Sequence, residues 1–262
     1  MDELVERQDE GGVARLTLNA PDRLNALSDA MIEALHGRLT ETGRNDAVRC
    51  VVIAGAGRAF CAGHDLREMQ AARQSADGGA AAHRDLFDRC ASMMLAITHH
   101  PRPVIAEVHG VAVAAGCQLA ATCDMVVAEQ TARFGVNGVN IGLFCSTPMV
   151  ALSRAVPRKA AFEMLTTGRL VGAAEAQRIG LVNRVAPEGE LRAATDELAQ
   201  AVAGKLGAAV RIGKEAFYRQ AEMTLEDAYA YAGGMMAANL SDDDTIAGID
   251  AFLEKKPMPW SN

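Results

Sequence analysis

Two segments rich in glycine and alanine carry the strongest chemical signal in this chain. The first runs over residues 57–66 and the second over residues 109–120. Each follows an apolar stretch typical of a strand and precedes a stretch typical of a helix. Small residues let a backbone approach a ligand closely, and a helix N-terminus presents unpaired N–H groups with a partial positive charge. Two such N–H groups that converge from these segments would form an oxyanion hole.

Other kinds of site receive less support. The run Gly55-Ala-Gly57 follows a strand, but Phe60 stands where a dinucleotide-binding loop has its third glycine, so a nicotinamide dehydrogenase is disfavoured. Cys61, His64 and the pair at 99–100 lack a second cluster with metal-ligand spacing, and we expect no metal site. The chain also lacks a G-x-S-x-G elbow, a Walker loop and an H-E-x-x-H motif.

The elements that must position these segments can be predicted from periodicity. The pattern predicts strands over 13–18, 50–54, 104–108 and 125–128, and helices after Ser28, over 86–97 and over 115–122. The continuous apolarity of 50–54 indicates a sheet covered on both faces. Later patterns are mostly helical, at 148–155, 159–166, 173–179, 189–204, 208–221, 225–239 and 243–254, with a strand-like piece at 181–185. The chain therefore reads as an α/β protein whose last third is a helical appendage.

The composition is typical of a globular enzyme. The 262 residues are 50% hydrophobic and 23% charged, with a formal net charge of −7, which argues against a nucleic-acid partner. The acidic N-terminus lacks the apolar core of a signal peptide, and no apolar run is long enough to predict a membrane span. Six cysteines without a C-x-x-C pair indicate reduced, buried thiols. We expect a cytoplasmic protein.

Motifs along nearly the whole chain resemble those of the enoyl-CoA hydratase/isomerase (crotonase) family. They are Pro21-Asp-Arg-Leu-Asn-Ala-Leu27, Ala59-Phe-Cys-Ala-Gly-His-Asp-Leu66, Gly116-Cys-Gln-Leu-Ala120 with Cys123-Asp124, Phe134-Gly135, Thr167-Gly-Arg169, Ala173-Ala-Glu-Ala176 with Gly180-Leu-Val182, and Ala251-Phe-Leu-Glu-Lys-Lys256.

This resemblance implies a crotonase-like spiral of repeated ββα units over residues 1–200 and a helical trimerisation region over 201–262. It implies a coenzyme A thioester as substrate, with no separate cofactor, and a homotrimer or dimer of trimers. The apolar residues Ile246, Ile249, Phe252 and Leu253 recur on one side of the last predicted helix, as a packing stripe would require.

The same resemblance assigns site residues. The oxyanion amides fall on His64 and Ala115, and participation of the His64 imidazole stays open. The implied substrate-binding positions are Arg23, Ala26, Ala62, Gly63, Asp65, Leu66, Gly116, Phe252 and Lys255, the last two reaching CoA bound to a neighbouring copy. Asp65 also has the residue type and position to cap the helix that follows it.

The chain departs from the family pattern where a hydratase has two glutamates. These positions fall on Gln118 and Gly138. An amide cannot accept a proton from water at neutral pH, so glutamate-dependent hydration is doubtful. A decarboxylase branch of the superfamily shares the histidine at 64 and a run like 139–142, and its tyrosine falls on Cys145, which is either a buried thiol or a group near the acyl chain. Decarboxylation and silent thioester binding therefore remain as alternatives.

Overall fold

The computed structural model describes residues 3–260 and contains a six-stranded mixed sheet. Its strand order is β1-β2-β3-β4-β6-β9. These strands are β1 (Val5–Glu10), β2 (Val13–Leu18), β3 (Cys50–Gly55), β4 (Val104–Val108), β6 (Met125–Glu129) and β9 (Arg184–Ala186). The first two strands form an antiparallel hairpin, and the other neighbours are parallel.

A second, three-stranded sheet lies beside the site. It has the order β5-β7-β8, where β5 is Val111–Val113, β7 is Arg133–Gly135 and β8 is Val171–Gly172. The sequence pattern did not predict these short strands, because two or three residues are too few to show a period of two. The hairpin strand β1 was also missed, since Val5 is its one fully buried side chain and the strand shows no alternation.

Both faces of the large sheet are covered, as the apolar run at 50–54 predicted. Val51 and Ile53 point into the main core, and Cys50 and Val52 point into a second core beneath α8 (Leu191–Ala203). The main core is closed by α1 (Asp29–Arg44), α3 (Ala80–Thr98) and α4 (Ala115–Thr122). A parallel strand between two helical layers must be apolar on both sides, which explains its sequence.

Local capping signals set several helix starts. Ser28 Oγ accepts from the Met31 amide at 3.1 Å, so α1 begins where the cap predicted. Asp65 caps α2 (Leu66–Ala72) in the same way, accepting from the amides of Arg67 and Glu68. The following helices are α5 (Pro148–Ala155), α6 (Arg158–Thr167) and α7 (Ala173–Arg178), close to their predicted ranges.

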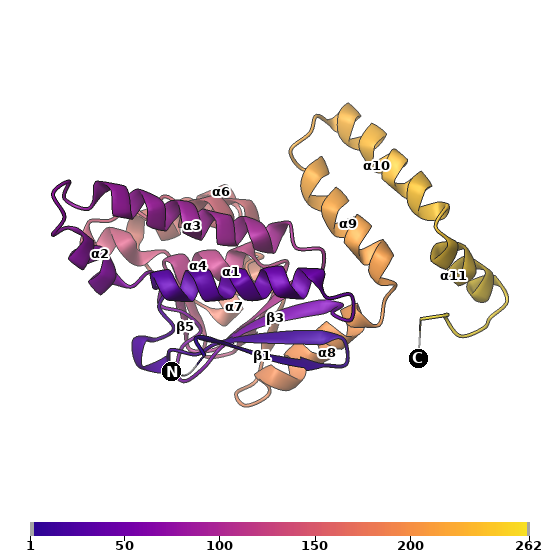
Figure 1. Cartoon of the computed structure of the whole chain (residues 1–262), viewed down its shortest axis with the longest axis horizontal. Coiled ribbons are helices and arrows are strands. Elements are labelled where there is room, and N and C mark those ends of the chain that lie inside the picture. Colours follow the sequence, from indigo (N-terminus) through magenta and orange to yellow (C-terminus); the bar gives the residue numbers. More distant parts are fainter. Residues whose placement is uncertain (1–2, 261–262) are drawn as a thin grey trace.

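The C-terminal helices form an arm that projects away from the sheet (Figure 1). The arm consists of α9 (Gly207–Gln220), α10 (Leu225–Leu240) and α11 (Asp243–Leu253). None of the α10 side chains is buried. Its large apolar side chains and those of α11 are exposed, namely Leu225, Tyr229, Met236, Leu240, Ile246, Ile249, Phe252 and Leu253. The stripe predicted on the last helix therefore exists, but this chain alone does not cover it.

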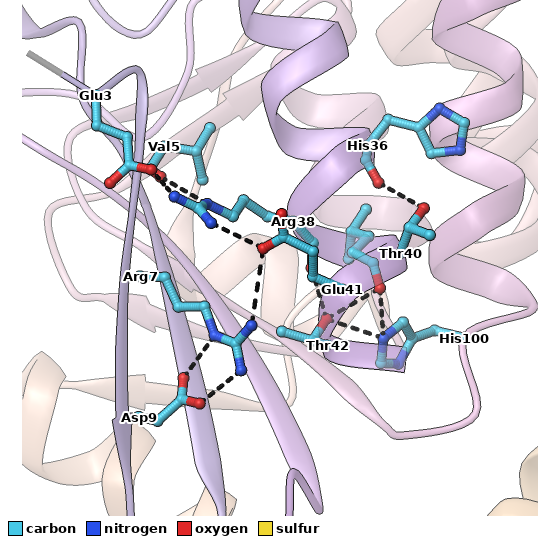
Figure 2. A network of polar contacts seen from close by, with 11 residues as sticks. Glu3, Val5, Arg7, Asp9, His36, Arg38, Thr40, Glu41, Thr42 and His100 are labelled. Carbon is cyan, nitrogen blue, oxygen red and sulfur yellow. Dashed lines mark hydrogen bonds and ion pairs between the residues drawn. The ribbon is translucent and has the colours of Figure 1, made fainter. Parts of the chain in front are cut away.

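Polar contacts join the hairpin strand β1 to α1 (Figure 2). Arg7 pairs with Asp9 on the same strand and approaches Glu41 on α1 at 3.8 Å. Arg38 pairs with Glu41 at 2.8 Å and donates to the Val5 carbonyl at 3.3 Å. Pairs on the surface contribute little to stability, so we assign the attachment of β1 mainly to its six-residue ladder with β2 and to the buried Val5 side chain.

All six cysteines are buried and free, as the sequence predicted. Among residues 3–260, no three His, Cys, Asp or Glu side chains are grouped so that they could hold a metal ion. None of the described helices combines the length and the apolar character needed to span a membrane.

His100 makes the fold sensitive to acid. Its Nε2 lies 3.1 Å from the Leu39 carbonyl and 3.2 Å from Thr42 Oγ1 (Figure 2). Its Nδ1 accepts from the Arg102 amide at 3.1 Å. Burial lowers the pKa of His100 below its ordinary value, so the folded state favours the neutral ring. The contribution to stability is therefore present at neutral pH and decreases as the pH falls below about 6.5.

We predict that the melting temperature decreases from pH 7.5 to pH 5, and that His100→Gln reduces this decrease because an amide does not titrate. Thermal melting at both pH values measures the effect. His36→Gln is the matched control, since His36 lies on α1 and is less buried. An equal acid response in the wild type and in His100→Gln would show that His100 does not cause it.

Candidate active site

The two glycine- and alanine-rich segments lie side by side. Cys61 pairs with Ala112 as an isolated parallel bridge, in which the Val113 amide donates to the Cys61 carbonyl at 3.0 Å. A Cβ built on Gly63 would lie 3.1 Å from the Ala115 nitrogen, so the residue before His64 adjoins the first residue of α4. The segments therefore converge in the way that their sequence pattern predicted.

The amides of His64 and Ala115 are free to donate. Among residues 3–260, neither amide has a hydrogen-bond acceptor. Ala115 is the first residue of α4, so its N–H also carries the positive end of the helix dipole. The preceding Ala114 has φ 49° and ψ −120°, a strained conformation that ends β5 abruptly and starts the helix. This geometry provides a pair of preorganised donors.

Two glycines permit this close approach. Gly63 has φ 90°, and a Cβ at this position would lie 2.9 Å from the Ala114 Cβ and 3.1 Å from the Ala115 nitrogen. A Cβ on Gly116 would lie 2.1 Å from the Cys61 carbonyl oxygen. Any side chain at either position would push α4 away from the His64 segment. Gly63 and Gly116 are thus structural parts of the site and do not line its cavity.

A cavity of about 660 Å³ opens in front of the two amides. Its walls include nine of the residues that the sequence assigned to the site, namely Arg23, Ala26, Ala62, His64, Asp65, Leu66, Ala115, Gly138 and Cys145. Asn25 supports the wall from behind, because its buried amide accepts from the Ala20 N–H and donates to the carbonyls of Ala56 and Ala59.

Arginines and apolar side chains surround the mouth of the cavity. Arg23 is 64% exposed and lies 3.4 Å from Asp65. Arg58 and Arg67, which were not among the predicted site residues, line the same cavity. Their positions within and just after the first motif were the available signal. The apolar lining, also missed, includes Met69, Phe87, Ile141, Leu143 and Phe144.

The ring nitrogens of His64 are shielded from solvent. Both ring nitrogens are buried and lack a partner among residues 3–260, and the ring packs edge-on against Phe87 with centroids 5.6 Å apart. Burial lowers the pKa of His64, and this outweighs the opposite effects of the Leu27 backbone and the Asp29 carboxylate. The imidazole is therefore neutral at neutral pH, and its nitrogens do not face solvent in the cavity.

Gly138 has no room for a side chain. It lies in the short 3-10 turn Asn137–Ile141, and a Cβ would lie 2.3 Å from the Leu143 carbonyl oxygen and 2.9 Å from Cys145 Sγ. The Cys145 thiol is 7% exposed, and burial raises its pKa, so it is neutral. This part of the cavity wall contains no carboxylate and could not accept one without movement of the backbone.

Three predicted site residues lie elsewhere. Gln118 lies in the middle of α4, one turn beyond Ala115, and it lines a second cavity beneath α9. Its Oε1 is buried without a partner among the described residues. Phe252 and Lys255 are exposed on the arm and do not line the first cavity, so within one chain they do not contact this site.

Comparison with known proteins gives the class to which this fold and site belong. A family model described as enoyl-CoA hydratase/isomerase matches residues 8–262. The chain belongs to the enoyl-CoA hydratase/isomerase family, and the predicted crotonase-like α/β fold is confirmed.

Particular relatives cover nearly the whole chain. A crystal structure of enoyl-CoA hydratase from Mycobacterium smegmatis is 50% identical with a TM-score of 0.95, each chain being covered completely. The human enoyl Coenzyme A hydratase domain-containing protein 3 is 39% identical with a TM-score of 0.93, covering 98% of this chain and 100% of that one. Its mouse counterpart, named as mitochondrial, is 40% identical over 99% of this chain and 85% of its own length.

The expected cytoplasmic location is contradicted. Five vertebrate relatives, from mouse, rat, frog, human and zebrafish, are named mitochondrial. The expectation rested on an acidic N-terminal segment and on cysteines interpreted as reduced, and these features do not specify a compartment.

We predict that Gly63→Ala destabilises the protein by about 2 kcal/mol and weakens acyl-CoA binding, because the new methyl group contacts Ala114 and Ala115. Thermal melting and calorimetry measure these effects. Gly78→Ala is the matched control, since Gly78 also has a positive φ but has nothing within 4 Å of a Cβ. Equal losses in both variants would assign the effect to backbone strain alone.

Proposed function

We propose that this protein binds an acyl-CoA thioester in the first cavity and polarises its carbonyl with the amides of His64 and Ala115. The single observation that carries the proposal is that His64 and Ala115, whose amides have no acceptor in the part of the chain that the structure describes, line one cavity. Charge develops on the thioester oxygen as the acyl group becomes an enolate. Each preorganised donor in such a site typically lowers the barrier by about 3 kcal/mol.

The charge distribution at the mouth supports a phosphate-bearing ligand. The protein is net negative, so local cations must attract CoA. Arg23, Arg58 and Arg67 surround the opening, and a guanidinium group binds phosphate through charge-assisted hydrogen bonds. Members of this family bind acyl-CoA thioesters as a class. We assign these arginines to the phosphates of CoA.

We further propose that a neighbouring copy completes the site. The arm exposes an apolar face on α10 and α11, and the cavity mouth exposes Ile141, Leu143 and Phe144. These two surfaces do not meet within one chain, and a head-to-tail contact that closes into a trimer would cover both. Such a contact would bring Phe252 and Lys255 to the CoA bound by the neighbour.

We infer the kind of reaction from what lines the cavity. It has two backbone donors and two neutral side chains, His64 and Cys145, and no carboxylate at Gly138. Asp22 and Asp65 also line the cavity, but Asp65 pairs with Arg23 and caps α2, so the lining supports enolate stabilisation more directly than activation of water. Decarboxylation and silent binding, the two alternatives left open by the sequence, receive no support from the names of the relatives.

Binding of a conjugated enoyl-CoA tests the proposed oxyanion hole. We expect the absorption band of a cinnamoyl-type CoA thioester to move to longer wavelength when bound, because polarising the carbonyl lowers the energy of the excited state. We also expect crotonyl-CoA hydration to be slower than that of a hydratase with both glutamates by about 10²-fold or more. An unshifted band at saturation would contradict the oxyanion hole, and fast hydration would show that another group activates water.

Gln118→Glu tests whether a carboxylate on α4 restores hydration. We predict that it does not, because residue 118 lines the other cavity. We also predict that the variant melts below the wild type, and that this difference is larger at pH 8 than at pH 5. The reason is that burial raises the pKa of a carboxyl group and penalises its charged form. Gln118→Met is the uncharged control. A clear gain in crotonyl-CoA hydration in Gln118→Glu would place this side chain at the reacting atoms.

A further inference from the structure

Asp124 lies two residues beyond the end of α4, and both of its carboxylate oxygens accept hydrogen bonds. Oδ2 accepts from Lys214 Nζ at 2.7 Å and from the Val104 amide at 2.6 Å. Oδ1 accepts from the Tyr218 hydroxyl at 2.8 Å. The Asp124 amide also donates to the Val104 carbonyl at 2.9 Å. The end of α4 is thus attached to the start of β4 and to two side chains of α9, a group that we call the Asp124 latch (Asp124, Val104, Lys214 and Tyr218).

Lys214 extends the latch to two further segments. Its ammonium donates to the carbonyls of Ile97 at 2.9 Å and Arg102 at 3.1 Å as well as to Asp124. An ammonium has three N–H donors, so every one of them has an acceptor. The side chain is 7% exposed, and an ammonium buried to this degree is tolerated only when fully paired. One group therefore connects α9 with the end of α3, the segment before β4 and the end of α4.

The latch lies at the opposite end of α4 from the Ala115 amide. Lys214 and Tyr218 are four residues apart, so they leave α9 on the same face and reach Asp124 together. Helix α4 has eight residues and is about 12 Å long, short enough to move as one body. A displacement at its latched end is therefore transmitted to its first amide. Oxyanion stabilisation depends on donor distances that must be correct to within a few tenths of an ångström.

We propose that Lys214 and Tyr218 are positioning residues that, through Asp124, hold α4 so that the Ala115 amide faces the thioester oxygen. Because α9 is the first helix of the arm, the position of the arm on the core affects how well the amides of His64 and Ala115 can bind the thioester oxygen. The inference rests on the proposed oxyanion hole, and it adds a dependence of that hole on residues more than 90 positions further along the chain.

Tyr218→Phe tests the coupling with the removal of one oxygen atom. The readouts are the absorption shift of a bound cinnamoyl-type CoA thioester at saturation, its calorimetric dissociation constant, and the melting temperature. We expect the shift to decrease by about half or more while the dissociation constant changes by less than about threefold, because the latch acts on one donor and not on the CoA contacts. The matched control is Tyr231→Phe, which removes a buried hydroxyl of the arm that has no partner among residues 3–260.

Lys214→Met is the second variant and removes the ammonium. We expect it to lose more of the shift than Tyr218→Phe. If Lys214→Met does not fold, Tyr218→Phe decides alone. A full shift in folded Tyr218→Phe would overturn the coupling, as would equal losses of shift and affinity in Tyr218→Phe and Tyr231→Phe. A wild-type protein that binds the thioester without any shift would overturn the proposed oxyanion hole itself, which separates the two failures.

Discussion

The structure depends on the close approach of two backbone segments that are far apart in the sequence. Residues 61–63 lie against residues 112–116, and at Gly63 and Gly116 the contact is closer than a side chain would permit. Gly63 and Gly116 are required because a Cβ on either would meet backbone or Ala114 atoms. The sheets, the strained Ala114 and the short helix α4 all serve to maintain this contact. Two unpaired amides beside a cavity are its direct result.

The electrostatics of the cavity follow from the same arrangement. Burial keeps His64 and Cys145 neutral, so neither side chain adds a charge beside the two N–H groups. Backbone dipoles in a site with little water are stronger than in solution, and they need no reorganisation as charge develops. The largely buried Asp65 lines the same cavity and pairs with the exposed Arg23. The cavity therefore combines arginines suited to recognition with backbone donors suited to chemistry.

The arm gives the molecule its second organising feature. Its helices expose large apolar side chains, yet its first helix is fixed to the core by a buried, fully paired ammonium. Apolar surface of this kind is unfavourable in water unless it is covered. The buried ion pair fixes the orientation of α9 on the core more than it adds to the stability of the fold. Attachment at one end and an uncovered face at the other suit a segment that contacts another copy of the chain. The site, the latch and the arm then form one continuous structure.

Much of the local structure could be predicted from the sequence. The apolar run at 50–54 predicted a strand between two layers, Ser28 and Asp65 predicted the starts of their helices, and the glycine-rich segments predicted the place of the site. These features depend on neighbouring residues, so their signal is local. The approach of the His64 segment to Ala115, the lack of space at Gly138, the place of Gln118 beside the second cavity and the convergence of Lys214 and Tyr218 on Asp124 were decided by tertiary structure alone. Each is a contact between distant segments whose geometry depends on the packing of everything between them, and no local pattern encodes it.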